Sequence, residues 1–275
     1  MTDTITSRTW QETPLPDNPF RPGRCLCAGY DVYGDLLGKA AWTEYLFLLL
    51  KLEPPTPAQH RLLDRLAVAL ANPGPRDHGV QAAMASAAGG AGAAANLIAA
   101  LAVGAGRFGG GRDVVDSMGL LLASQGDPAY WARQVPDTTA RDPGRYDEVW
   151  PAAEHVPGFD PFSNQTIPPV RQALDRLAEV SPGPHLGWLQ QHLATLEAGT
   201  GLGLAVSAVA AAALLDLDLD PEQGEMLYLL LRLPGAAAHA LEQRERGWQD
   251  FPFYHDGIVL KDSPLDTGNK GEHHD

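Results

Sequence analysis

Apolar residues recur at helical spacing along most of the chain. The segment 40–53, "AAWTEYLFLLLKLE", predicts a helix that stops at the "PPTP" after it. Thr56 and Pro57 then offer the next helix an N-cap and a proline at its first position. Leucine and valine repeat every three or four positions in later segments, which predicts amphipathic helices over 56–71, 112–125, 168–180 and 185–199.

Three further segments lack a regular polar face or are interrupted. Residues 203–220 are apolar on all sides, which predicts a helix buried on every face. Residues 80–106 are mostly Ala and Gly, and they predict one helix or two, with a break at 89–90 and close backbone packing. Residues 221–246 predict a pair of helices separated at Pro234.

Strand patterns are few, and only "RCLCAGYDVYGD", residues 24–35, indicates a short strand before a glycine turn. Residues 1–24 are polar and rich in proline, so we expect an extended N-terminal arm. Residues 263–275 have no core-forming pattern, so we expect a disordered tail. The predicted class is all-α with one or two small hairpins.

The charge and the apolar segments limit the partners. The chain of 275 residues has a net charge of −14 and lacks the basic clusters that phosphate binding needs, which excludes nucleic acid. Residues 79–106 carry no charge, but residues 81–100 contain only Leu97 and Ile98 from the strongly membrane-inserting set. We therefore expect no membrane span. Because the N-terminus has no apolar signal core, we expect a cytoplasmic protein.

Cys25 and Cys27 are the two cysteines of the chain and lie too close together for a disulfide framework. A C-x-C pair can ligate a metal, but no second pair or neighbouring His/Cys cluster completes a site. We predict a reduced pair and no bound metal.

Residues 104–118, "GAGRFGGGRDVVDSM", are the strongest candidate for a ligand-binding turn. Glycines of this kind let the backbone approach a ligand or another backbone closely. Arg107 and Arg112 flank the turn and are suited to a phosphate or carboxylate. The preferred alternative is that they pair with Asp113 and Asp116 on a solvated helix start.

Several spaced motifs resemble the citrate synthase superfamily, and most of all its short citryl-CoA-lyase-like members. Residues 29–79 have a "GYD" turn, a leucine-rich helix, a "TPAQ" turn and a "DHG" before a small-residue helix, in the family's order. "LRLPGAAAHALEQ" resembles the family's "ARTPG-x-x-AH-x-x-E". The resemblance is collinear from about residue 29 to about residue 254.

The resemblance implies an all-α fold with a large helical domain, residues 25–108 and 208–262, and a smaller one, residues 109–207, in an obligate dimer. It also implies a CoA thioester and a 2-oxo acid as substrates, in carbon–carbon bond formation or cleavage. In the family, two histidines and an aspartate transfer the protons, which is general acid–base catalysis with stabilisation of the developing charge.

The family's three reactive positions are not matched. Its "G-P-L-H-G-G-A-N" resembles "GRFGGGRD", so Gly109 stands where one histidine belongs. Its "V-P-G-[FY]-G-H" resembles "VPGFD", in which Asp160 and Pro161 occupy the region of the second histidine. Its "N-V-D" resembles "AVS", which puts Ser207 at the aspartate position. Gly has no proton to donate, and Ser is not basic near pH 7 without a partner base.

Other pocket positions do match. His78 resembles the oxo-acid-binding histidine, and Arg232 resembles a carboxylate-binding arginine, whose planar guanidinium suits a carboxylate. Alternatively, His78 caps a helix or sits in a core hydrogen bond, and Arg232 is an ordinary surface arginine. Asp160 is the candidate replacement acid or base, although "DPF" is also a common turn sequence. The loop expected to contact CoA is Val156, Pro157, Gly158 and Phe159.

Two functional hypotheses remain open. In the first, the chain is an acyl-CoA-dependent transferase or lyase of the citrate synthase type with a rebuilt catalytic set. In the second, it is an inactive member that serves as a structural or regulatory subunit of an active paralogue. A further alternative is a chain that binds a thioester without turnover. The expected ligands are acyl-CoA and a small carboxylate, and the expected assembly is a homodimer or a heterodimer with that paralogue. Ordinary citrate synthase activity is expected to be very weak.

Overall fold

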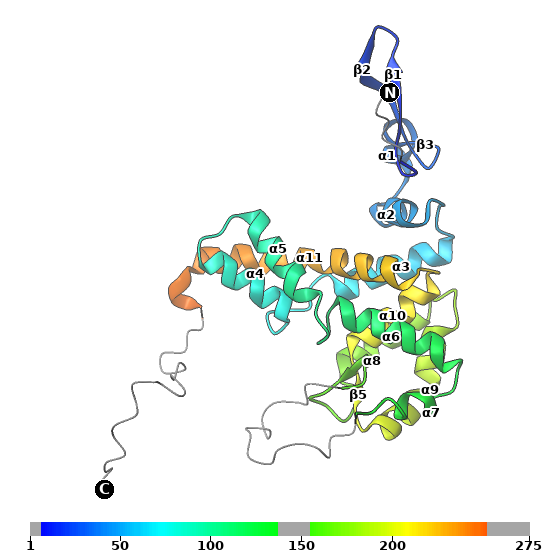
Figure 1. The fold of residues 1–275 in the computed structure, drawn as a ribbon, viewed down its shortest axis with the longest axis vertical. Coiled ribbons are helices and arrows are strands. Elements are labelled where there is room, and N and C mark those ends of the chain that lie inside the picture. The colour runs from blue at the N-terminus through cyan, green and yellow to red at the C-terminus, as the bar shows by residue number, and fades with distance from the viewer. Residues whose placement is uncertain (1–6, 137–154, 252–275) are drawn as a thin grey trace, which may run out of the picture.

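The computed structural model describes residues 7–136 and 155–251, which fold mainly into α-helices (Figure 1). The helices are α1 (Leu37–Lys39), α2 (Trp42–Lys51), α3 (Pro57–Leu70), α4 (His78–Ala88), α5 (Ala93–Gly104), α6 (Gly111–Ser124), α7 (Ala129–Ala132), α8 (Pro168–Ala178), α9 (His185–Thr200), α10 (Val206–Asp216) and α11 (Pro221–Arg246). A π-helical turn, Val32–Leu36, precedes α1, and a 3-10 turn, Trp248–Asp250, follows α11. The predicted all-α class is confirmed, while the predicted tail at 263–275 lies outside the described residues.

Two small antiparallel sheets accompany the helices. One joins β1 (Gln11–Leu15), β2 (Asn18–Cys27) and β3 (Tyr30–Asp31). The other pairs β4 (Phe159–Asp160) with β5 (Gly203–Leu204). The second sheet brings the "VPGFD" loop next to the start of α10.

The first sheet corrects the expectation of an extended arm over residues 1–24. From residue 11 onwards the arm is a hairpin, which projects away from the helices in Figure 1. Leu15 pairs with Asn18 across a turn of proline and aspartate, two residues that favour tight turns. The prolines of β1 and β2 are compatible with such a ribbon because strand edges need no N–H donor on their outer side.

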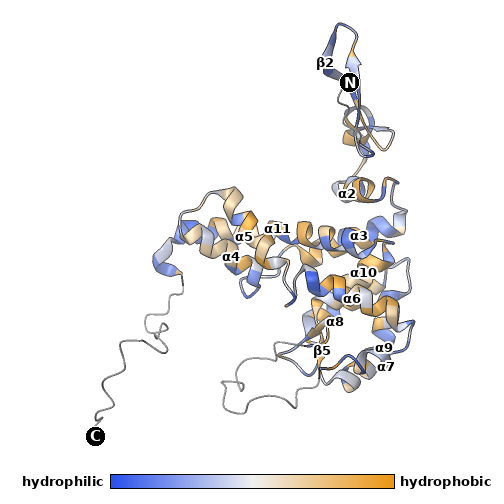
Figure 2. Ribbon diagram, in the orientation of Figure 1, coloured by the Kyte–Doolittle hydropathy of each residue, from blue (hydrophilic) through white to orange (hydrophobic). Residues whose placement is uncertain are grey.

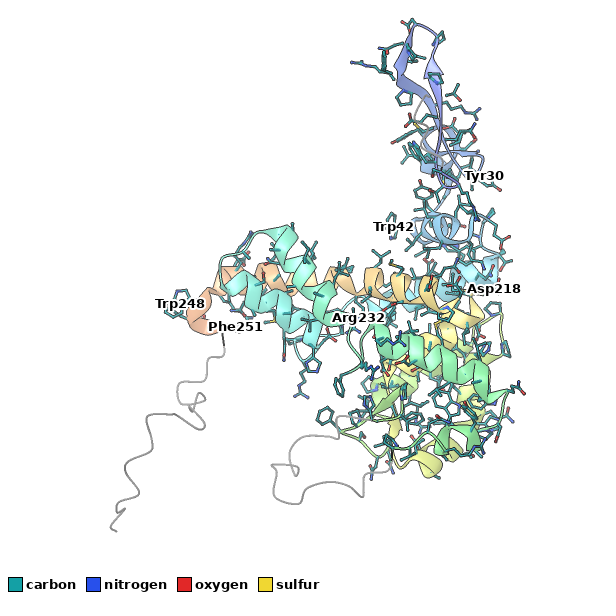
Figure 3. All side chains as sticks on the ribbon, viewed as in Figure 1. Tyr30, Trp42, Asp218, Arg232, Trp248 and Phe251 are labelled. Atoms are coloured by element: carbon teal, nitrogen blue, oxygen red, sulfur yellow. The ribbon has the colours of Figure 1, made fainter. Side chains whose placement is uncertain are left out.

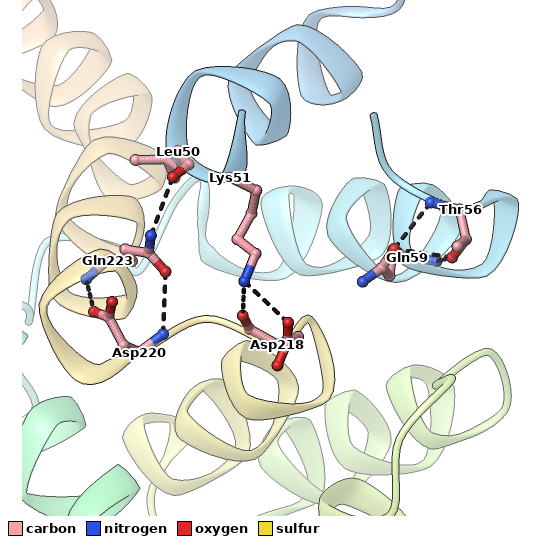
Figure 4. Close-up of polar contacts among 7 residues, drawn as sticks. All are labelled: Leu50, Lys51, Thr56, Gln59, Asp218, Asp220 and Gln223. Atoms are coloured by element: carbon pink, nitrogen blue, oxygen red, sulfur yellow. Dashed lines mark hydrogen bonds and ion pairs between the residues drawn. The ribbon is translucent and has the colours of Figure 1, made fainter. Parts of the chain in front are cut away.

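Capping side chains fix the starts of α3 and α11. As predicted, Thr56 caps α3: its Oγ1 accepts the Gln59 N–H at 3.2 Å, and Gln59 Oε1 accepts the Thr56 N–H at 2.9 Å (Figure 4). Asp220 and Gln223 form the same arrangement at the start of α11. Gln223 Nε2 also donates to the carbonyl oxygen of Leu50 at 3.0 Å, which ties the end of α2 to the start of α11.

The larger hydrophobic core surrounds α10. This helix is buried on nearly all sides, as its apolar sequence predicts, and it contacts α6, α8 and α9. Four aromatic side chains are fully buried in the same core: Phe47, Trp131, Phe159 and Tyr228. Figure 2 shows apolar residues along α10 and the helices beside it. This core forms one wall of the site described below.

A smaller core of mostly alanines joins α4, α5 and the C-terminal half of α11. Its buried members are Val80, Ala83, Ala87, Ala100, Ala236 and Ala240. The predicted break at 89–90 is confirmed, because α4 ends at Ala88 and α5 begins at Ala93. A Cβ at Gly79 would lie 3.0 Å from the carbonyl oxygen of Ala100, so the close contact of the two helices depends on glycine there.

Pro234 does not separate two helices, which corrects the predicted helix pair. α11 continues through it from Pro221 to Arg246. Proline removes one N–H donor from a helix and usually kinks or breaks it. Here the N–H of the next residue, Gly235, donates to the carbonyl oxygen of Ala71 at 2.7 Å, just beyond α3. Contacts with α3, α4, α5 and α6 hold α11 continuous past the proline.

α11 contributes to both cores. Leu227 and Leu231 belong to the larger one, and Ala236 and Ala240 belong to the smaller one. The predicted domain boundaries near residues 108 and 207 remain a prediction. None of the helices in the described ranges has the length and apolar character needed to cross a membrane.

Candidate functional site

A cavity of about 420 Å³ lies between the start of α4, the glycine turn and the loop of β4. It is lined by His78, Phe108, Gly109, His155, Phe159, Asp160, Pro161, Phe162 and Ala205. Its volume falls in the range of small-molecule sites, about 300–1,000 Å³. Two predicted site residues, His78 and Asp160, therefore share one cavity with Gly109, the position at which the resemblance places a histidine.

The glycine turn is fixed by donors from α11. Gly109 has φ +64°, a conformation that side-chain-bearing residues rarely adopt. Its carbonyl oxygen accepts hydrogen bonds from Tyr228 Oη at 2.7 Å and from Arg232 Nη1 at 2.6 Å. Burial raises the pKa of Tyr228 to about 12, so its hydroxyl keeps its proton at neutral pH.

Arg232 is engaged within the chain. It lies midway along α11, beside the loop that leads into α6 (Figure 3). Its Nη2 forms an ion pair with Asp77, and its Nη1 donates to Gly109 and Tyr228. Asp77 in turn caps α4 by accepting the Val80 N–H at 3.1 Å. Arg232 thus holds the glycine turn and the start of α4, and it already pairs with a carboxylate of the chain itself.

The loop predicted to contact CoA is tightly packed. Gly158 has φ +82°, and a Cβ there would lie 2.8 Å from both Ala208 Cβ and Ser117 Oγ. Val156 and Phe159 are buried in the larger core, and Phe159 is the one of the four loop residues that lines the cavity. The loop therefore shapes one wall of the cavity, and its contact with CoA remains a prediction.

Asp113 is buried beneath this loop, which corrects the solvated position predicted for it. Its Oδ1 accepts the Gly158 N–H at 2.9 Å, while its Oδ2 has no hydrogen-bond partner among the described residues. Burial raises the pKa of Asp113, and the hydrogen bond from Gly158 and the attraction to His155 offset this only in part. Asp116, the second aspartate expected to pair with an arginine of the turn, does form an ion pair: its carboxylate lies 2.9 Å from the Arg112 guanidinium.

Ser207 lies near Asp113 at the start of α10. Its Oγ is buried and also lacks a hydrogen-bond partner among the described residues. The hydroxyl is nevertheless close enough to the carboxylate to lower the pKa of Asp113. The two groups are thus neighbours without a hydrogen bond of normal geometry. The position that resembles the family's aspartate has a carboxylate beside it, supplied by α6 instead of α10.

His155 is a cavity residue that sequence reasoning missed. It is half-buried, and its ring stacks on Phe108 with the centroids 5.3 Å apart. Phe108 directly precedes Gly109, so the His155 imidazole lies beside a glycine turn that itself contains no histidine. The sequence could have pointed to His155 because it directly precedes "VPGF". The family's histidine instead follows that loop.

His78 and Asp160 reach the cavity from different elements. His78 is the first residue of α4 and is exposed, and the helix cap expected of it is made by Asp77 instead. Asp160 ends β4, and its Oδ1 accepts the Phe162 N–H at 2.9 Å, which is the turn expected for "DPF". Asp160 therefore stabilises the turn and also lines the cavity.

The acid–base groups around the cavity are therefore His78, His155 and Asp160, with Asp113 behind its wall. Among the residues that the structure describes, no cluster of three His, Cys, Asp or Glu side chains could hold a metal ion. Cys25 and Cys27 are buried and unpaired on β2, far along the chain from the site.

The fold is shared with several solved structures. Citryl-CoA lyase from Hydrogenobacter thermophilus superposes with a TM-score of 0.72 at 19% identity, over 95% of this chain and 96% of that one. ATP citrate lyase from Methanothrix soehngenii, in complex with citrate and coenzyme A, gives 0.72 at 16% identity, over 98% of this chain and 44% of that one. Citrate synthase from Thermoplasma acidophilum, in complex with carboxymethyl coenzyme A and oxaloacetate, superposes with a TM-score of 0.58 at 13% identity, over 86% of this chain and 59% of that one. No family profile and no curated protein matches the sequence itself.

These comparisons place the chain in the class of all-α proteins with the citrate synthase fold. Within that class it is similar to citryl-CoA lyase over nearly the full length of both chains, whereas it spans less than half of ATP citrate lyase. The fold implied by the resemblance of the sequence motifs is confirmed. The predicted dimer stays a prediction.

Proposed function

We propose that the cavity binds a CoA thioester together with a small carboxylate, and that it carries out carbon–carbon bond cleavage or formation between them. The observation that carries this proposal is the meeting of His78, His155 and Asp160 with the glycine turn in one cavity of about 420 Å³. Such a set can donate and accept protons, as chemistry at the α-carbon of a thioester requires.

The ligand classes are supported by proteins of the same fold. The ATP citrate lyase structure contains citrate and coenzyme A, and the citrate synthase structure contains carboxymethyl coenzyme A and oxaloacetate. A cavity of this size has room for an acyl group and a small carboxylate, with the rest of CoA outside it.

A second candidate is a non-catalytic subunit that stabilises or regulates an active paralogue. It is favoured by Gly109 and Ser207, which carry no useful acid or base at two positions resembling the family's reactive ones. It is also favoured by the ion pair of Arg232 with Asp77, which occupies the guanidinium expected to bind a carboxylate.

Binding is the first test of the proposal. A ligand at 100 times its Kd stabilises the folded state by about 2.7 kcal/mol, which raises the Tm of a chain of this size by about 5–10 °C. We expect acetyl-CoA and CoA to raise the Tm, and oxaloacetate or citrate to add to the shift. If none of these ligands changes the Tm at millimolar concentration, the proposal is wrong.

Turnover separates the two candidates. We expect the purified chain to release free CoA from acetyl-CoA and oxaloacetate, or to cleave citryl-CoA, more slowly than the typical enzyme range of about 1–1,000 per second. Asp160→Asn should lower this rate by about 100-fold, as is usual for loss of a general acid or base. A chain that binds the ligands but turns over only when an intact paralogue co-purifies with it would favour the subunit role.

A further inference from the structure

We propose that His155 is a catalytic residue of this cavity, whose imidazole exchanges a proton with the substrate oxygen, and that Asp113 is its positioning residue. The inference rests on the proposed function and deepens it, because it names the group that replaces the histidine absent from Gly109. It assigns chemistry to two residues for which the resemblance gave no role.

The placement of the imidazole is the first support. His155 lines the cavity, and its ring lies almost parallel to that of Phe108, at 18°. Stacking occupies a face of the imidazole and leaves its two nitrogens, which lie on the ring edge, available for hydrogen bonds. Since Phe108 is adjacent to Gly109, a substrate oxygen at the glycine turn comes within reach of that edge.

The buried carboxylate behind the wall is the second support. Asp113 is 2% exposed, and its Oδ2 has no hydrogen-bond partner among the described residues. An unsatisfied buried carboxylate oxygen costs stability, and such groups in folded proteins call for an explanation in function. The Oδ1 of Asp113 accepts the Gly158 N–H at 2.9 Å, three residues after His155, so the carboxylate lies beneath the loop that begins at that histidine.

The remaining charges near Asp113 do not obstruct an interaction with His155. His78 and Asp160 face the same cavity, and Asp116, which also acts on Asp113, is neutralised by Arg112 at 2.9 Å. Asp113 is thus a buried carboxylate beneath the His155 loop, suited to stabilise a protonated His155 as an orienting acid does for a catalytic histidine in other folds.

In the cleavage direction the substrate is a 3-hydroxyacyl thioester that carries a carboxylate at the hydroxyl-bearing carbon. His155 takes the hydroxyl proton as the carbon–carbon bond breaks and the oxygen's electron pair forms the carbonyl of a 2-oxo acid. The electrons of the broken bond pass to the thioester as an enolate, which takes a proton at carbon from water by way of Asp160, and His155 returns its proton to the solvent. Condensation is the reverse of these steps, and neither direction needs a redox partner.

The test compares His155→Phe with His192→Phe. Both histidines are half-buried and packed against an aromatic ring, His155 on Phe108 and His192 on Trp188 at 5.0 Å, but His192 lies on α9 outside the cavity. Phenylalanine keeps the stacking and removes the titratable nitrogens. We expect His155→Phe to lower kcat by about 100-fold or more, and His192→Phe to leave kcat unchanged.

Asp113→Asn tests the positioning role. Asparagine can still accept the Gly158 N–H through its oxygen, so the loop is retained while the charge is lost. We expect a fall in kcat of at least tenfold with KM changed by less than about threefold, and no loss of Tm. A role limited to holding the loop would leave kcat unchanged in this variant, and that result overturns the assignment of Asp113.

The outcomes distinguish this inference from the proposed function. If the unaltered chain binds thioester and turns it over, and His155→Phe does so equally well, the inference is wrong and the proposed function stands. If the unaltered chain binds thioester but neither breaks the carbon–carbon bond nor exchanges the α-protons of acetyl-CoA with solvent, the inference is also wrong and the subunit role is favoured. Absence of binding by the unaltered chain overturns both.

Discussion

Among single residues, Asp113 is the side chain whose position is hardest to explain by stability. It is buried, one oxygen is unpaired, and burial raises the pKa of its carboxyl above the usual value. A carboxyl whose pKa is raised in the folded state adds stability below its unfolded pKa and loses that contribution as the pH rises through the folded pKa. At neutral pH the charged form of Asp113 therefore works against folding.

Asp113→Asn is predicted to stabilise the protein at pH 7. The neutral amide avoids burying a charge, and we expect a gain on the order of 1 kcal/mol, or about 2–4 °C in Tm. The gain should shrink as the pH falls through the raised pKa of Asp113, because the carboxyl of the unaltered chain then becomes protonated as well. Thermal unfolding at pH 4 and pH 7 checks both points, and a variant less stable than the unaltered chain at pH 7 would contradict them.

The residues of the site could be predicted from the sequence only in part. His78, Asp160 and Gly109 were found because they lie inside motifs with a fixed order, and the structure brings them to one cavity. His155 and Asp113 were missed because their positions depend on the orientation of a loop and of α6 in the folded chain. Residue spacing does not determine these orientations. Asp113 reads as a polar residue in the first turn of a helix, yet it faces the core.

Among the elements, α9 depends on a carboxylate from another helix. Its N-terminus has no side-chain cap of its own. Asp216, at the end of α10, accepts the N–H groups of His185 at 2.8 Å and Leu186 at 3.0 Å, the Ser181 hydroxyl at 2.6 Å, and the His185 imidazole at 2.8 Å. Burial alone would raise the pKa of Asp216, but these hydrogen bonds outweigh it and lower the pKa.

Asp216→Asn is predicted to destabilise the protein by about 2–3 kcal/mol at pH 7, because charge-assisted hydrogen bonds to buried groups are lost. A carboxyl with a lowered pKa contributes stability above its unfolded pKa, about 3.9, and loses it as the pH falls through the folded value, so the penalty should shrink in acid. Urea unfolding at pH 7 and below pH 4 measures this. Asp218 forms an exposed ion pair with Lys51, so Asp218→Asn serves as the control. It should lower the free energy of unfolding by less than about 1 kcal/mol.

Gly235→Ala tests the contact that carries α11 past its proline. The added Cβ would lie 2.6 Å from the carbonyl oxygen of Ala71, so α11 and the end of α3 must separate, at a cost of about 1–3 kcal/mol. Gly119→Ala, on an exposed position of α6 with open space around it, should instead stabilise by about 0.5–1 kcal/mol. Equal effects of the two substitutions in denaturant unfolding would show that the packing at Gly235 is not tight.

Helix boundaries were predicted well where nearby residues determine them, and less well where tertiary contacts determine them. The cap of α3 at Thr56, the stop of α2 and the break between α4 and α5 are all fixed by residues within a few positions. Pro234 was misread because the contacts that support α11 come from segments more than a hundred residues away. Small hairpins were predicted, but not one over residues 11–27, because the prolines there argue against strands in general, although not at the edges of a ribbon.

For the whole molecule, α5 is an apolar helix that a single chain leaves incompletely covered. The helix carries no charge, yet only Asn96 and Ala100 are buried, and Ile98 and Val103 are 64% and 46% exposed. Figure 2 shows the apolar character of this helix at the side of the molecule. Because an uncharged helix faces solvent here, we predict that this region lies in or beneath a dimer contact.

Ile98→Glu is predicted to weaken such a dimer, because it places a charge in an apolar contact. Sedimentation equilibrium at micromolar concentration should give about twice the 29.4 kDa chain mass for the unaltered protein and a lower average mass for the variant. Val68→Glu, at an isolated apolar residue of α3 that is 80% exposed, should leave the mass unchanged. A monomeric unaltered chain would remove the basis for this prediction.

A crystal structure of the full chain with CoA and citrate would test the central claim most directly. We predict that the acyl-bearing end of CoA and the carboxylate occupy the cavity beside Gly109, with a ligand oxygen within about 3.2 Å of a nitrogen of His155. Ligands bound elsewhere on the chain, or bound in the cavity with His155 turned away from every ligand oxygen, would contradict it.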